Sequence, residues 1–153
     1  MKRGKVWIPI VVLGAAAFFW RFSMGHGNPA SEDDQIKVLL ARPGAVEVLS
    51  WLETAPMGSR FVGGGYKEYD QVQATALVRE LYRRGAVKVT AIDIVNDQNE
   101  EGEDVQYTAT LIVELPDEPT SRKRLFDLDA SEVQPEYDPA VENGQRYFML
   151  WWD

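Results

Sequence analysis

With 153 residues, of which 45% are hydrophobic, the chain is long enough for one domain with a modest core and too apolar to be disordered. The first 25 residues hold four of the 16 Lys and Arg residues and none of the 24 acids, so the rest carries a formal charge of −12, which disfavours nucleic-acid binding. The absence of cysteine excludes disulfides, thiolate nucleophiles, thiolate metal sites and a lipidated cysteine.

A basic stretch followed by an uncharged apolar run opens the chain. Residues 6–20 carry no charge, and at about 1.5 Å per residue they span roughly 22 Å, less than a hydrocarbon core of about 30 Å. A membrane crossing therefore requires Arg21 and its neighbours. Because basic residues lead and acids follow, residues 1–25 are predicted to form a single-pass anchor with the rest outside the cytoplasm. The alternative is a secretory signal that is cleaved near Gly25.

The segment after the anchor divides into a short linker, residues 26–30, and one extracytoplasmic domain, residues 31–153. Two helices are predicted at the start of this domain. The first opens with a capping box at residues 31–34, and the second covers residues 45–54, where apolar residues recur at helical spacing. Because the linker is short, we expect the domain and any envelope partner to lie close to the membrane.

From Arg60 onward the pattern predicts the order strand, helix, strand, strand, helix, strand. This order is that of ferredoxin-like folds, in which a four-stranded antiparallel sheet carries both helices on one face. The predicted class is thus α+β, a ferredoxin-like βαββαβ unit with two extra N-terminal helices. The predicted elements are a strand at 60–62, a helix capped by Asp70 and Gly85, a hairpin of 86–95 and 105–115, a helix from Pro119 and a strand at 145–152.

The last predicted strand is apolar on both faces, although a ferredoxin-like fold would place it at a sheet edge. A strand of this kind is normally covered on both faces. We therefore expect one or both of the upstream helices to pack across the open face of the sheet. The first strand also departs from the fold, which would place it centrally, because it is short and runs into glycines.

Three consecutive glycines, Gly63, Gly64 and Gly65, precede the helix that Asp70 caps. Backbone N–H groups before a helix attract anions, so these glycines are a candidate ligand-binding loop. Their spacing matches neither the dinucleotide-binding nor the P-loop pattern. The alternative is a plain strand-to-helix connection, and the ligand hypothesis rests on analogy with ferredoxin-like regulatory domains.

Acidic residues suggest two further sites. Residues 97–104 partly resemble a calcium loop, but position twelve is Thr108, so a solvated hairpin tip is the better interpretation. Asp93 and Glu114 could form a catalytic acid pair, against the simpler view that both are solvated. His26 is the only histidine and lies in the linker, so no histidine-based triad or zinc site is expected in the domain. No metal, cofactor or catalytic residue is predicted.

Two tryptophans, Trp151 and Trp152, end the last strand. They are interpreted as core residues, one on each sheet face. Alternatively, one ring is exposed and contributes to a partner-binding surface, because aromatic side chains dominate binding hot spots.

These features favour a membrane-tethered, non-catalytic module that binds another envelope protein. An exposed tryptophan or sheet edge would support this hypothesis. The first alternative is a small-ligand sensor of the ferredoxin-like regulatory type. The second is a carboxylate-based hydrolase, which requires two acids facing each other about 5 to 10 Å apart in a cleft.

Overall fold

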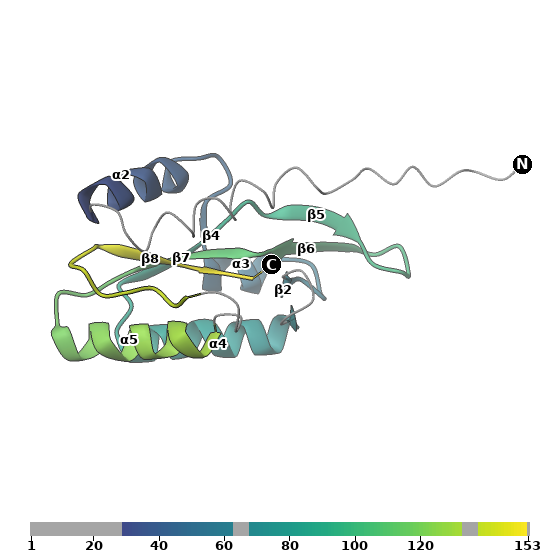
Figure 1. Cartoon of the computed structure of the whole chain (residues 1–153). Helices are drawn as coiled ribbons and strands as arrows, with labels where there is room; N and C mark the ends of the chain where they lie inside the picture. Colours follow the sequence, from purple (N-terminus) through teal and green to yellow (C-terminus); the bar gives the residue numbers. More distant parts are fainter. Residues whose placement is uncertain (1–28, 63–67, 133–137, 153) are drawn as a thin grey trace, which may run out of the picture.

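The computed structural model describes residues 29–62, 68–132 and 138–152 (Figure 1). The fold class is α+β, as predicted. The helices are α2 (Pro29–Leu40), α3 (Val48–Thr54), α4 (Gln71–Arg84) and α5 (Pro119–Glu132). The strands are β1 (Val46–Glu47), β2 (Arg60–Val62), β3 (Glu68–Tyr69), β4 (Lys88–Ile92), β5 (Val95–Gln98), β6 (Asp104–Thr108), β7 (Thr110–Glu114) and β8 (Tyr147–Trp151).

The strands form two four-stranded sheets, with orders β1-β4-β7-β8 and β3-β2-β6-β5. A long bent hairpin joins them, because β4 continues into β5 and β6 continues into β7. The bend lies at Asp93, which has a positive φ of 53°. There the buried hydroxyl of Thr108 donates to the Ile92 carbonyl at 2.6 Å and accepts from the Thr110 N–H at 3.1 Å. This side chain supplies hydrogen bonds where the regular strand pairing is interrupted.

The strand order differs from the single four-stranded sheet that was predicted. β2 pairs in parallel with β6, but β8 pairs directly with β7. The reason is the length of β2, whose three residues occupy only part of the edge formed by β6 and β7. β8 fills the remainder of that edge. The Trp152 N–H donates to the Ala109 carbonyl at 3.0 Å, and the Trp152 ring stacks on Phe61 with centroids 5.5 Å apart.

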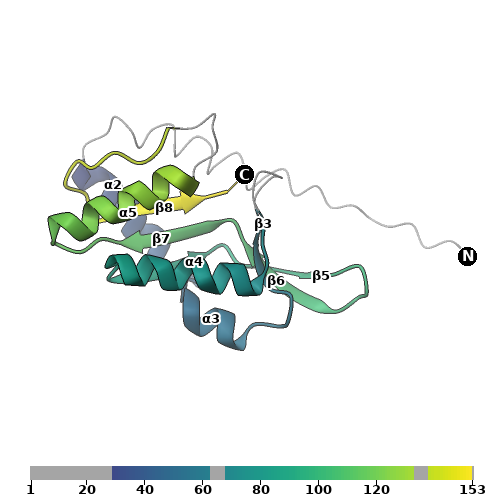
Figure 2. The ribbon, with the colours of Figure 1, turned by 90° about the horizontal axis from the view of Figure 1, so that it is seen from below.

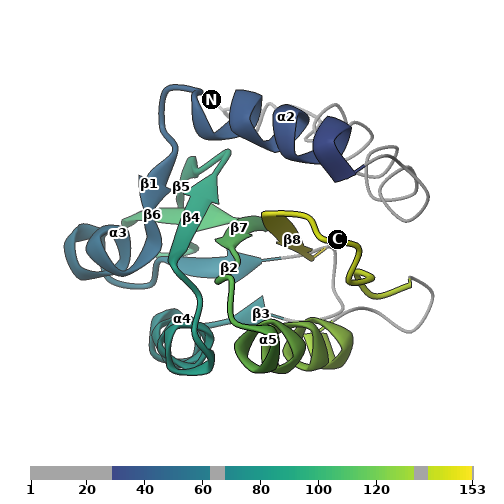
Figure 3. The ribbon, with the colours of Figure 1, turned by 90° about the vertical axis from the view of Figure 1, so that its left-hand side faces the viewer.

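Helices cover both faces of the first sheet (Figures 1 and 3). α4 and α5 lie side by side on one face, with α3 beside α4 (Figure 2). Their core includes Val89, Leu111, Val113, Phe148 and Leu150 of the sheet. α2 lies on the opposite face, where a smaller cluster contains Ile36, Leu39, Ile92, Ile112 and Tyr147. One of the two upstream helices therefore covers the open face, and the apolar character of β8 on both faces follows from this arrangement.

Local signals account for the helix ends. Asp70 accepts from the Gln73 N–H at 2.8 Å and the Gln73 side chain accepts from the Asp70 N–H, so the predicted capping box is confirmed. Gly85 ends α4 with a left-handed φ of 109°, also as predicted. The second helix begins at Val48, later than predicted, because Val46 and the following residue pair with β4. The first begins at Pro29, before the predicted capping box.

Within the described residues no helix has the length and apolar character needed to cross a membrane. The predicted anchor, residues 1–25, lies outside the described residues, and so do most residues of the predicted linker.

Candidate functional site

The predicted glycine loop cannot be assessed, because Gly63, Gly64 and Gly65 lie outside the described residues. The residues on either side of the gap, Val62 and Glu68, pair with each other in β2 and β3.

Trp151 and Trp152 are both buried, with 6% and 1% of their surface exposed. Successive residues of a strand point to opposite faces, so the two rings lie on different sides of the sheet. Trp152 belongs to the core beside α4 and α5, where it packs on Phe61 and Tyr69. Their interpretation as core residues is confirmed. Partner binding through these rings stays a prediction, and it would require the strand end to move.

The two acids considered as a catalytic pair are not brought together. Glu114 pairs across the sheet with Lys88, which is five residues from Asp93 along the chain. At about 3.4 Å per residue, the two acids are separated by roughly 17 Å. Each has a basic partner instead: Asp93 lies 3.8 Å from Arg42, and Glu114 lies 2.7 Å from Arg146.

The acidic segment considered for calcium is a hairpin turn that is held by hydrogen bonds to the side chain of Asn99. β5 extends to Gln98, so the connection is shorter than predicted. The Asn99 side-chain oxygen accepts from the N–H groups of Glu101 and Glu103, at 3.0 and 2.9 Å. Among the described residues no group of three or more His, Asp or Glu side chains is placed to hold a metal ion.

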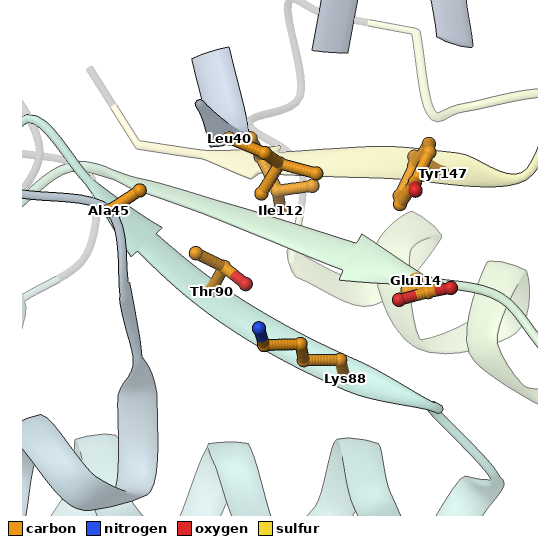
Figure 4. Close-up of a pocket in the computed structure, with 7 residues that line it drawn as sticks. All are labelled: Leu40, Ala45, Lys88, Thr90, Ile112, Glu114 and Tyr147. Carbon is orange, nitrogen blue, oxygen red and sulfur yellow. The ribbon is translucent and has the colours of Figure 1, made fainter. Parts of the chain in front are cut away.

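A groove of about 230 Å³ lies between the C-terminal end of α2 and the exposed part of the first sheet (Figure 4). We call it the α2 groove. It is lined by Leu40, Ala45, Lys88, Thr90, Ile112, Glu114 and Tyr147. α2 packs with Ile92 of β4, Ile112 of β7 and Tyr147 of β8, and the groove lies beside its last residue, Leu40. The lining of the groove is part apolar and part polar.

Besides Glu114, the α2 groove has three polar side chains, those of Lys88, Thr90 and Tyr147. Lys88 and Thr90 are two positions apart on β4, so both point to the α2 side (Figure 4). Thr90 is 5% exposed and Tyr147 is 8% exposed, yet neither hydroxyl makes a hydrogen bond to a described residue. Lys88 likewise forms no ion pair there. Neither hydroxyl oxygen is fully enclosed, so solvent in the groove can satisfy both of them.

Arg146 neutralises the one acid of the groove. Its guanidinium donates to Glu114 Oε1 through Nε at 3.0 Å and Nη2 at 2.7 Å. The hydrogen bond to Glu114 raises the pKa of Arg146 above its ordinary value. The same guanidinium lies 5.6 Å from the centre of the Tyr147 ring. Asp33, whose carboxylate accepts from the Arg146 N–H, also acts on this guanidinium.

Sequence reasoning missed the α2 groove. Lys88 and Thr90 were placed on a strand, and their spacing of two did indicate a shared face. The missing information was which helix covers that face and how far it extends. This depends on contacts of Ile36 and Leu39 with distant strands, which no local pattern reveals.

No known protein family matches the chain, and no curated protein or solved structure is significantly similar to it.

Proposed function

We propose that the chain is a membrane-tethered, non-catalytic domain outside the cytoplasm that binds a small ligand in the α2 groove. The observation that carries this proposal is the groove itself, a cavity of about 230 Å³ whose apolar floor, Leu40, Ala45 and Ile112, lies beside the polar Lys88, Thr90 and Tyr147. Binding sites for small molecules typically combine such a floor with a few converging polar groups. The tether and the compartment rest on the charge and hydropathy of residues 1–25.

This proposal keeps the sensor hypothesis but moves its site. Ferredoxin-like regulatory domains suggested a ligand at the first strand–helix junction, whereas the α2 groove lies on the other face of the sheet. A ferredoxin-like relationship is itself part of the proposal. The parallel pairing of β2 with β6 and the long antiparallel hairpin support it, and the direct pairing of β8 with β7 departs from it.

A titration of the full chain in detergent micelles with a set of acidic, neutral and basic small molecules tests ligand binding. Amide chemical shifts measured by ¹H–¹⁵N NMR would report the site. We expect at least one compound to shift the amides of Thr90, Ile112 and Tyr147 in a saturable way at roughly millimolar concentration. If every compound leaves these amides unchanged while the spectrum remains that of a folded domain, the proposal is wrong.

Binding of another envelope protein remains the second candidate function, and one surface feature favours it. Met57 and Val72 are 89% and 78% exposed. Met57 precedes Gly58 and Val72 follows Gln71, and the Gln71 side chain accepts from the Gly58 N–H at 3.3 Å and donates to the Leu52 carbonyl at 2.9 Å. Methionine is enriched at protein interfaces.

The partner hypothesis is tested by photo-crosslinking in an envelope extract from a reactive residue placed at Val72. A discrete crosslinked product that disappears when Met57→Ser is added would support it. The same crosslinker at Val38, which is exposed on α2, serves as the control. Equal products from both positions would rule out a specific surface at Met57 and Val72.

A further inference from the structure

We infer that the chain self-associates, with the acidic hairpin of one copy docked on the basic face of α4 and α5 in another copy. This contact is separate from the α2 groove and goes beyond the proposed function. The acidic hairpin consists of β5, β6 and their turn, and its acids are Asp97, Glu100, Glu101, Glu103 and Asp104. The basic face is defined by the cations Arg79, Arg83, Arg84, Lys123 and Arg124.

The acidic hairpin projects beyond the helices, at the end of the domain opposite the start of α2 (Figure 1). All of its acids are exposed, and within the described part of the chain none of them forms an ion pair. Their hydrogen bonds are local. Asp97 accepts from the Gln98 N–H at 2.8 Å, and Glu103 accepts from the Asn99 side chain at 3.0 Å. The described residues of the same copy therefore leave the negative charge of the hairpin without a counter-charge.

The basic face is continuous across two helices that lie side by side (Figure 2). Arg84 of α4 donates through Nη1 to the Arg124 carbonyl of α5, at 2.8 Å. Arg83 and Arg84 share one acid, Glu80, whose Oε1 lies 2.6 and 2.7 Å from their nitrogens. Because two guanidiniums share one carboxylate, the C-terminal part of α4 keeps an excess of positive charge.

Two guanidiniums of the basic face have no acidic partner in the part of the chain that the structure describes. Arg79 is exposed on α4, and the Arg124 side chain donates to the Ser121 hydroxyl at 3.0 Å. Lys123 lies 2.7 Å from Asp127 in an exposed pair, which holds the two side chains only weakly. Five cations against two acids leave the face with a formal charge of +3.

The charge of the whole domain identifies the occupant of the basic face. Residues 26–153 have a formal charge of −12, so most of the surface repels the acidic hairpin of another copy, whereas the basic face attracts it. Complementary charges of this kind decide which patches meet, and salt screens them. We therefore expect a weak, salt-sensitive contact. Because it joins two different patches, it can continue from copy to copy instead of closing as a symmetric pair.

Paramagnetic broadening between two copies tests this contact. The chain has no cysteine, so Gln98→Cys places a single spin label on the hairpin without changing its charge. The labelled copy is mixed with a ¹⁵N-labelled wild-type copy, both as full chains in detergent micelles at roughly millimolar concentration. In about 0.05 M salt we expect broadening of the amides of Arg79 and Arg124, and none at Val38 on α2. In about 0.5 M salt the broadening should disappear.

Charge reversal on both sides makes the test specific. Glu100→Lys combined with Glu101→Lys in the spin-labelled copy should lower the broadening about tenfold. Arg79→Glu combined with Arg124→Glu in the ¹⁵N copy should lower it to a similar extent. When these two reversed copies are mixed with each other, the broadening should return, because opposite charges face each other again.

Asp117→Lys combined with Asp138→Lys in the spin-labelled copy is the matched control. It makes the same change in net charge at two exposed acids outside the hairpin, and it should leave the broadening within about twofold of the wild type. If this control lowers the broadening as much as the hairpin variant, or if the two reversed copies fail to restore it while both keep a folded spectrum, the inference is wrong. Ligand binding in the α2 groove is reported by other amides and is unaffected by either outcome.

Discussion

At the scale of single residues, Tyr82 links the start of α3 to the first long strand. Its hydroxyl donates to Glu47 Oε1 at 2.6 Å and accepts from the Val89 N–H at 3.1 Å. Tyr82→Phe would leave the Val89 N–H without its acceptor, so we expect a loss of about 1 to 2 kcal/mol in the free energy of unfolding. Urea denaturation at neutral pH measures this loss, and an unchanged midpoint would contradict the role assigned to Tyr82.

The same residue makes a pH-dependent prediction. Burial, together with the hydrogen bond to Glu47, raises the pKa of Tyr82 from 10.0 to about 12. Because the folded state holds this proton more tightly than the unfolded state, the resulting stability is complete below pH 10 and is lost as the pH rises toward 12. The difference in unfolding free energy between wild type and Tyr82→Phe should therefore shrink across this interval. If the difference in unfolding free energy stays constant over this interval, the pKa of Tyr82 is not raised in the folded state.

At the scale of elements, the contact between α4 and α5 depends on Gly85. Its φ is 109°, and a Cβ there would lie 2.8 Å from both Cβ and Oγ of Ser121. Gly44 has a similar φ of 92° but open space around it, so Gly44→Ala measures backbone strain alone, about 1 kcal/mol. Gly85→Ala should cost about 1 to 3 kcal/mol more, because the two helices must separate. If Gly85→Ala and Gly44→Ala lose the same free energy in thermal or urea unfolding, α5 moves away from α4 without a measurable cost.

The docking of α2 depends on Asp33 as well as on apolar contacts. The carboxylate of Asp33 accepts from the N–H groups of Arg146 and Tyr147, at 2.9 and 3.2 Å. Asp33→Ala should reduce the free energy of unfolding by about 1 to 2 kcal/mol and speed hydrogen exchange of the Tyr147 amide. Asp34→Ala is the control, since within the described part of the chain Asp34 bonds only to the exposed Lys37, and its loss should change stability by under about 0.5 kcal/mol. Matching effects of the two variants would count against a specific role for Asp33.

The elements differ in how far the sequence could predict them. The sequence predicts α4 well because its ends depend on residues that are close together in the chain. These are Asp70 with Gln73 at one end and Gly85 at the other. The sequence does not predict the placement of β8. This placement depends on the three-residue length of β2 and on which part of the β6–β7 edge remains free. Pairing between distant segments leaves no periodic pattern in the chain.

At the scale of the whole molecule, one arrangement explains both a success and a failure of the sequence analysis. A strand that is apolar on both faces indicated that a helix covers the open face of the sheet, and α2 does so. The same helix covers that face incompletely, and the α2 groove lies beyond its end. No residue of the groove has a conspicuous motif, so the candidate site follows from the tertiary structure alone. The buried tryptophans, which the sequence made conspicuous, belong to the core.

The most direct test of ligand binding in the α2 groove is the detection of contacts between a bound ligand and named side chains. Intermolecular nuclear Overhauser effects can be measured between the compound that the amide-shift titration selects and the isotope-labelled methyl groups of the full chain in micelles. The groove predicts contacts with Leu40 and Ile112. Contacts confined to Met57 and Val72, or none at a concentration that saturates the amide shifts, would contradict binding in the groove.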